Sequence, residues 1–218
     1  MPSDHYFSSN PRSGRAPRTI RVQLAGREVA LETAGGVFSP ERLDTGTRVL
    51  LGTVPEPPQQ GHLLDVGCGW GPIALTLALT AREATVWAVD VNERALDLVR
   101  RNARRLGLDN VNAVLPDDVP DGIRFGTIWS NPPIRVGKAE LHALLLRWLP
   151  RLDADAIAWL VVQRNLGSDS LQRWLDEALP AGFEVDRAEL SKGYRVLTVS
   201  APGGQAPGQG ASSNLTRD

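Results

Sequence analysis

A glycine-rich turn with acidic residues around it is the first feature of this sequence that could do chemistry. The run Gly67–Gly71 has a glycine at every second position and directly follows the apolar segment Leu63–Val66. Glycines after a strand let the backbone approach a ligand closely, and the helix that follows offers free N–H groups to a carboxylate or phosphate. The spacing differs from a dinucleotide-binding fingerprint, because Pro72 stands where that pattern needs its third glycine.

The acidic residues near this turn narrow the choice of ligand. Asp65, at the end of the apolar segment, would repel a pyrophosphate but could hold an ammonium group, directly or through water. Asp90 ends the next apolar segment, about 20 residues further on, where an acid can accept both hydroxyls of an adenosine ribose. A ligand with an amino group, a carboxylate, a ribose and no phosphate is S-adenosylmethionine. The alternative is a glycine-rich turn needed only for packing.

A second motif, Asn131-Pro132-Pro133-Ile134, follows the apolar segment Phe125–Ser130. The Asn131 side-chain oxygen and the Pro132 carbonyl are two acceptors that could bind both hydrogens of an amine and aim its lone pair. The two prolines stiffen the loop and leave its carbonyls without competing N–H donors. Such a site would act on an amine by positioning and electrostatics, without a strong base. The alternative is a proline-rich turn that only ends a strand.

Strand and helix patterns alternate along the middle of the chain. Expected strands are Leu63–Val66, Thr85–Asp90, Val111–Leu115, Phe125–Ser130, Ala156–Gln163, Phe183–Leu190 and Tyr194–Ser200. Expected helices are Pro72–Arg82, Glu93–Leu106, Lys138–Leu149 and Ser168–Leu179. This alternation predicts an α/β fold with a mostly parallel sheet, in which the strand before Asn131 lies next to the strand before Gly67.

The sequence as a whole predicts four parts. Residues 1–18 form a flexible basic arm, and residues 19–58 form a hairpin and a helix packed on the domain. The hairpin joins Thr19–Leu24 to Arg27–Thr33, and the helix lies within Pro40–Val54. Residues 59–200 form the α/β domain, and residues 201–218 form a disordered tail rich in glycine, proline and serine.

The composition excludes several classes of protein. With 218 residues the chain has room for one catalytic domain, and a hydrophobic share of 42% excludes global disorder. The longest apolar runs fall well short of the roughly 18 residues that a membrane helix needs. The single cysteine, Cys68, excludes an internal disulfide and a multi-cysteine metal site. With no recognisable leader, we expect a cytoplasmic protein that needs neither a membrane nor a metal.

The glycine turn and its acids resemble the cofactor half of class I S-adenosylmethionine-dependent methyltransferases. The resemblance implies a Rossmann-like fold with helices on both faces of the sheet. It implies a cofactor site made of Asp65, Gly67, Cys68, Gly69, Gly71, Asp90, Val91, Asp118 and Asn131. Asp118 would lie near the adenine amino group, although adjacent acids such as Asp117 and Asp118 are also common in solvated turns. Cys68 itself is expected to fill space rather than act as a nucleophile. Trp70 is expected to pack in the core, although its place inside the glycine loop could let it line the cofactor pocket.

Asn131-Pro132-Pro133 resembles the N-P-P-[aromatic] motif of enzymes that methylate conjugated nitrogens, which implies catalytic roles for Asn131, Pro132 and Pro133. More separated segments resemble the small-subunit rRNA guanine-N2 methyltransferases, including compact members known as "methyltransferase small". These segments are His5–Ser8, Gly36–Ser39, Leu43–Thr47, Asn131–Lys138 and Gly193–Leu197. This resemblance implies a seven-stranded sheet with an antiparallel last strand. It also implies methylation of an exocyclic amine, guanine N2 of rRNA, on RNA or the small ribosomal subunit.

The substrate side is less completely determined by the sequence. Ile134 replaces the aromatic residue of the motif, so its contact with a base would be apolar, and Arg135 and Lys138 flank the loop where they could contact phosphates. The arginines of Glu93–Leu106 are expected to form a solvated face. Alternatives are a protein glutamine or adenine-N6 methyltransferase, a small-molecule amine methyltransferase, or a cofactor-binding RNA-assembly factor without turnover. The oligomeric state and the target nucleotide stay open.

Overall fold

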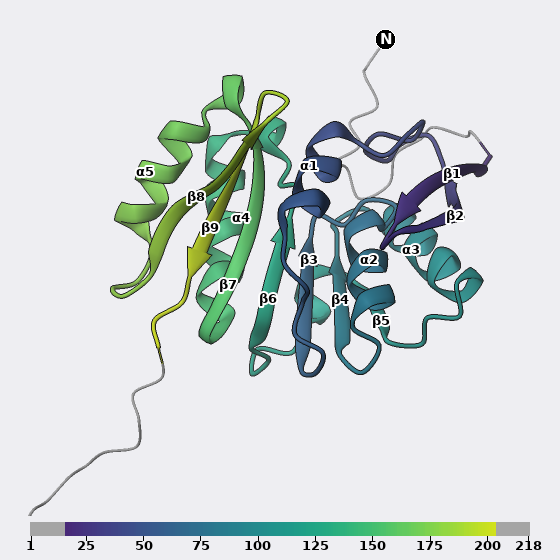
Figure 1. The fold of residues 1–218 in the computed structure, drawn as a ribbon, viewed down its shortest axis with the longest axis horizontal. Coiled ribbons are helices and arrows are strands. Elements are labelled where there is room, and N and C mark those ends of the chain that lie inside the picture. The colour runs from purple at the N-terminus through teal and green to yellow at the C-terminus, as the bar shows by residue number, and fades with distance from the viewer. Residues whose placement is uncertain (1–15, 204–218) are drawn as a thin grey trace, which may run out of the picture.

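A seven-stranded sheet forms the centre of the computed structural model, which describes residues 16–203 (Figure 1). The strands are β3 (His62–Val66), β4 (Thr85–Val89), β5 (Val111–Val114), β6 (Phe125–Ser130), β7 (Leu152–Gln163), β8 (Glu184–Ser191) and β9 (Tyr194–Ser200). Their order is β5-β4-β3-β6-β7-β9-β8. The first five strands in sequence are parallel, and β9 is antiparallel to both β7 and β8. The predicted sheet, its antiparallel last strand and the pairing of β6 with β3 are therefore confirmed.

Helices cover both faces of this sheet. They are α1 (Thr45–Thr53), α2 (Pro72–Thr80), α3 (Glu93–Arg105), α4 (Lys138–Trp148) and α5 (Ser168–Ala178). Neighbouring strand residues point to opposite faces, so Leu63 packs in the cluster beneath α1, α2 and α3, while Leu64 packs in the cluster beneath α4 and α5. The apolar runs of the central strands thus reflect burial on two sides.

The hairpin of β1 (Arg18–Leu24) and β2 (Arg27–Thr33) packs against α2 and α3 (Figure 1). Its turn at Ala25 and Gly26 has positive φ at both residues, as a tight two-residue hairpin requires. The Asn102 side chain of α3 fixes the position of β2, because its amide accepts from the Glu32 N–H at 2.7 Å and donates to the Glu32 carbonyl at 2.9 Å.

Two elements differ from the sequence-based expectation. The helix expected within Pro40–Val54 begins only at Thr45, because the Asp44 side chain caps it by accepting from the N–H groups of Gly46 and Thr47. β7 begins at Leu152 rather than Ala156, since pairing with Phe125 extends it through a polar segment. Most of the predicted arm and of the predicted tail lies outside the described residues. No helix of residues 16–203 has the length and apolar character of a membrane span.

Candidate active site

The glycine loop follows β3 at the edge of the sheet where the parallel strands end. The N–H groups of Gly67 and Cys68 both donate to the Val89 carbonyl of β4, at 2.8 and 3.0 Å. Gly67, Gly69 and Gly71 all have positive φ, so a side chain at any of these positions would strain the loop. The loop therefore crosses the end of β4 and delivers the chain to Pro72, the first residue of α2.

Asp65 lies beneath this loop and is completely buried. Its Oδ2 accepts from the Ala74 N–H at 2.9 Å, whereas its Oδ1 has no hydrogen-bond partner within residues 16–203. Burial raises the pKa of this carboxyl well above its usual value, an effect that the Ala74 hydrogen bond opposes and nearby Asp90 reinforces. A buried acceptor without a partner is costly for folding, so Asp65 is a candidate for a functional role.

Changing Asp65 to asparagine should make the stability of the protein less dependent on pH. A carboxyl with a raised folded pKa stabilises the fold below its unfolded pKa, and this contribution is lost as pH rises toward the folded pKa. Asp65→Asn keeps the acceptor for Ala74 and removes the buried charge. Urea unfolding should give equal stabilities near pH 4 and a more stable variant near pH 8. A variant less stable than the wild type at the higher pH would contradict this assignment.

Asp90 fastens the loop from the other side. Its Oδ2 accepts from the Gly69 N–H and its Oδ1 from the Asn92 N–H, both at 2.9 Å. Burial raises the pKa of Asp90, and these backbone hydrogen bonds oppose the rise. Each carboxylate oxygen retains further acceptor capacity, so the group can hold the loop and still accept hydroxyls from a ligand.

A cavity of about 310 Å³ opens beside these groups, at the lower end of the size range of small-ligand sites. Among the predicted site residues, those that line it are Gly67, Gly69, Asp90, Val91, Asn131, Pro132, Pro133 and Ile134. Contributors that the prediction did not name as site residues include Val37, Phe38, Asp44, Asn92, Gln163 and Tyr194. Phe38, Asp44 and Tyr194 belong to the segments that carried the family resemblance, which is the signal that could have identified them.

Other predicted residues lie away from this cavity lining. Cys68 packs its buried sulfur into the core, where burial raises the pKa of the thiol and keeps it protonated. Trp70 is also buried, as expected for core packing, and donates to the Ser39 carbonyl at 3.3 Å, so it does not take the alternative place in the cavity lining. Asp118 is exposed on the turn Pro116–Asp118, and it is Pro116 of this turn that reaches the cavity. Lys138 is exposed at the start of α4.

Asn131 is held in one orientation by residues from the start of α1. Its Nδ2 donates to Asp44 Oδ2 at 3.0 Å and to Thr47 Oγ1 at 3.1 Å. A carboxylate only accepts hydrogen bonds, so the amide must turn its nitrogen toward Asp44 and leave Oδ1 as the acceptor. The same Asp44 oxygen accepts the first N–H groups of α1, which makes it rigid. The proline motif marks Asn131 in the sequence, but nothing local marks its support, because Asp44 lies 87 residues earlier in the chain.

The proline loop differs from expectation in one detail. The Pro132 carbonyl accepts from the Ile134 N–H at 2.9 Å, so the prediction that it lacks a competing donor is wrong. One lone pair of this carbonyl still remains for a second donor. Ser130 joins the loop to β3 by donating to the Val66 carbonyl at 2.7 Å. A Cβ added to Gly67 would lie 3.6 Å from Pro133 Cδ, so the proline and glycine loops lie close together.

This arrangement places fixed hydrogen-bond acceptors beside a loop suited to a ligand with ribose and ammonium groups. The described residues contain no cluster of three or more metal-ligating side chains. The fixed acceptors, Asn131 among them, suit the positioning of an amine against a bound electrophile.

Comparison with known proteins gives consistent matches. The family model described as "Methyltransferase small domain" matches residues 28–198. The uncharacterized protein YbxB of Bacillus subtilis (strain 168) is 35% identical over 198 residues, covering 89% of this chain and 97% of YbxB. The ribosomal RNA small subunit methyltransferase C of Aeromonas hydrophila is 38% identical over 125 residues, covering 56% of this chain and 35% of that enzyme.

Solved structures share the fold. The T. thermophilus 16S rRNA N2 methyltransferase RsmC, in complex with AdoMet and guanosine, gives a TM-score of 0.72 at 23% identity, over 85% of this chain and 50% of that chain. TrmN from Thermus thermophilus gives a TM-score of 0.54 at 26% identity, over 72% of this chain and 48% of that chain. The matched part of this chain therefore spans about half of each of these two structures.

Proposed function

Because this chain belongs to the methyltransferase small domain family, we propose that it transfers a methyl group from S-adenosylmethionine to guanine N2 of ribosomal RNA. Dependence on S-adenosylmethionine and methyl transfer are properties of the family. The observation that carries the choice of an amine substrate is the fixed orientation of Asn131, whose oxygen is left free to accept an N–H. Support for RNA comes from relatives that are rRNA methyltransferases.

The residues present fit S-adenosylmethionine. The carboxylate of Asp90 suits the ribose hydroxyls, and the unpaired Asp65 oxygen beneath the loop suits the ammonium group, reached through a water molecule. The glycine loop and the first N–H groups of α2 suit the carboxylate of the methionine part. When bound, this cofactor supplies an electrophilic methyl group on a sulfonium centre.

The residues of the proline loop position the substrate amine. Asn131 Oδ1 and the Pro132 carbonyl accept its two hydrogens, which directs the nitrogen lone pair toward the cofactor. Asp44 and Thr47 hold the Asn131 amide, so it cannot rotate away when the substrate binds. The amine becomes more acidic as its new bond forms, and these acceptors then bind its hydrogens more strongly.

Aromatic side chains near the cavity support a planar substrate. Ile134 offers an apolar contact, while Phe38 and Tyr194 also line the cavity and come from distant parts of the chain. These rings give a base the aromatic surroundings that Ile134 alone does not provide. A base inside a duplex would have to be flipped out to enter this cavity.

Replacement of Asp90 by alanine should weaken S-adenosylmethionine binding by about 1–3 kcal/mol, the cost of a lost buried hydrogen-bond partner. Asp90 also holds the glycine loop, so calorimetry should compare the cofactor with its 2′-deoxyribose analogue. If Asp90 binds the ribose hydroxyls, the wild type should bind the cofactor more tightly than the analogue. The alanine variant, which lacks this contact, should bind both equally. An equal preference in both proteins would move the ribose contact to another residue.

The proposed function is tested by methyl transfer from tritiated S-adenosylmethionine. Assembled small ribosomal subunits, naked rRNA and total protein would be offered, all from cells lacking this enzyme. We expect label in RNA that maps to N2-methylguanine after digestion. Label in protein would favour a glutamine methyltransferase, and N6-methyladenine would favour the adenine alternative. Cofactor binding without label in any fraction would overturn the RNA assignment and favour a small-molecule substrate or a binding-only role.

A further inference from the structure

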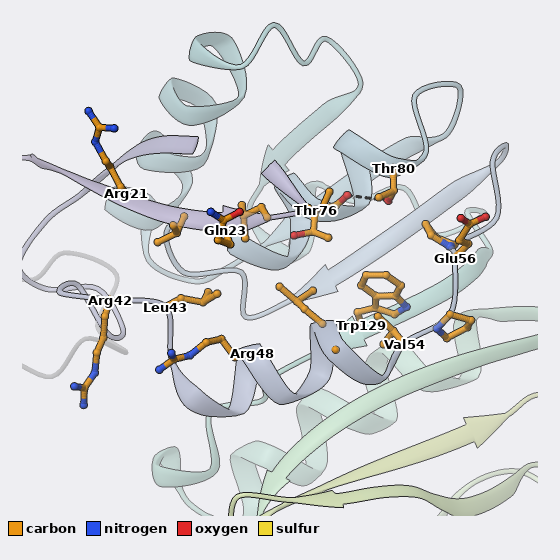
Figure 2. A pocket seen from close by; sticks show the side chains of 18 of the residues that line it. Arg21, Gln23, Arg42, Leu43, Arg48, Val54, Glu56, Thr76, Thr80 and Trp129 are labelled. Atoms are coloured by element: carbon orange, nitrogen blue, oxygen red, sulfur yellow. Dashed lines mark hydrogen bonds between the residues drawn. The ribbon is translucent and has the colours of Figure 1, made fainter. Parts of the chain in front are cut away.

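A second hollow lies beside α1 (Figure 2). It has a volume of about 660 Å³ and is bordered by β1, α1, α2 and the segment 55–57. We call it the hairpin groove. Its lining is largely apolar and includes Leu24 of the hairpin, Leu43, Leu51 of α1 and Trp129 of β6. Such a volume and lining suit a planar organic group.

Arginines gather at one end of the hairpin groove. Figure 2 shows Arg21, Arg42 and Arg48 around this end and Glu56 at the other. Arg21 pairs with Glu28 at 3.0 Å, so its charge is compensated. Arg42 and Arg48 are exposed, and neither forms an ion pair with any residue of the described range. Glu41 also lines the groove but pairs with Arg18 at 3.6 Å, so Arg42 and Arg48 give this end of the groove a net positive charge.

The positive end adjoins the candidate active site along the chain. Leu43 lines the hairpin groove, while its neighbour Asp44 lines the active-site cavity and holds Asn131. A polymer with one unit in the cavity would therefore pass the arginine end of the groove.

We propose that the hairpin groove binds the RNA strand beside the target nucleotide, with Arg42 and Arg48 on its phosphates and an unpaired base on the apolar floor. The inference rests on the proposed function, because it takes RNA as the substrate. Paired guanidinium groups next to an apolar surface are a recurrent arrangement for single-stranded nucleic acid. The charges at the two ends of the groove orient the bound strand. Its phosphates lie near Arg42 and Arg48, and away from Glu56.

Charge reversal at the positive end tests the phosphate contacts. The double variant R42E/R48E should bind an rRNA transcript more weakly, with a higher KM for RNA, an unchanged kcat and unchanged S-adenosylmethionine binding. The slope of log affinity against log salt should fall in magnitude by about 1.4, for two lost single-strand phosphate contacts. R42K/R48K should retain most of the affinity. The matched control R104E/R173E reverses two exposed arginines of α3 and α5 that lie outside the hairpin groove.

Gly52 allows a test of the groove itself without altering charge. This glycine of α1 lines the groove, has ordinary helical φ, and a Cβ added to it meets nothing within 4 Å. Gly52→Phe should place a ring in the groove and raise the KM for RNA, whereas Gly52→Ala should bind RNA like the wild type. Thermal melting of both variants would show that the fold is kept.

The outcomes separate this inference from the proposed function. A wild type that methylates RNA, with R42E/R48E indistinguishable from R104E/R173E, would overturn the groove assignment alone. If Gly52→Phe kept the wild-type KM for RNA, no base would bind on the floor of the groove. A wild type that binds cofactor but neither binds nor methylates RNA would overturn the proposed function.

Discussion

Replacing Asn131 by alanine should reduce methyl transfer by about a hundredfold or more, as expected for the loss of a preorganised polar contact. The side chain supplies the acceptor for the substrate amine, and its orientation is fixed by Asp44 and Thr47. S-adenosylmethionine binding should stay near the wild-type value, because Asp90 and the glycine loop are untouched. Single-turnover methyl transfer measures the first quantity and calorimetry the second.

A matched control separates this effect from a general loss of amide groups. Asn112 is an exposed asparagine of β5 outside the cavity, so Asn112→Ala should leave both transfer and binding unchanged. If Asn131→Ala kept the wild-type rate, Asn131 would have no part in catalysis. If cofactor binding fell as much as the rate, Asn131 would act by binding the cofactor rather than the substrate amine.

Exchanging Asp44 and Asn131 should restore activity that the single change at Asn131 removes. Asn131→Asp places a second carboxylate where the amide nitrogen now lies 3.0 Å from Asp44 Oδ2, so the two carboxyls repel each other or share a proton. We expect a loss of rate close to that of the alanine variant. The double variant D44N/N131D again pairs an amide with a carboxylate, and should transfer methyl groups at least about tenfold faster than Asn131→Asp.

The measurement is a double-mutant cycle with kcat, KM and melting temperature for four proteins. Asparagine is as good a helix N-cap as aspartate, so Asp44→Asn should keep α1 stable and its melting temperature unchanged. A purely structural role of Asp44 predicts additive losses of rate in the double variant. Recovery of kcat at constant melting temperature is the signature of a residue that positions Asn131.

Much of the fold could be predicted because the relevant signals are local. Buried strands are short apolar runs in the sequence. The turn at Gly67–Gly71 needs glycines because its backbone has positive φ at three positions. The hairpin turn at Ala25 and Gly26 and the start of α2 at Pro72 follow from the same kind of local preference. These features depend on a few adjacent residues, so the sequence alone indicates them.

The support of the active site depends instead on contacts between distant residues. In its local sequence Asp44 is recognisable only as a helix N-cap. The packing of α1 against the sheet brings its side chain to Asn131. The sequence allows Trp70 either core packing or a place in the pocket, and only the path of the glycine loop shows that its ring packs in the core. Phe38 and Tyr194 come from opposite ends of the domain, and no periodicity links them to the cavity.

The position of β9 affects when the protein can become active during its synthesis. β9 is translated after every other strand of the sheet, yet it lies between β7 and β8, and its first residue, Tyr194, lines the cavity. While β9 is still inside the ribosome, β7 has an unpaired edge and the cavity lacks the wall that Tyr194 provides. Methylation competence should therefore be reached only after the last strand has left the ribosomal exit tunnel, when insertion of β9 completes the sheet and the active site together.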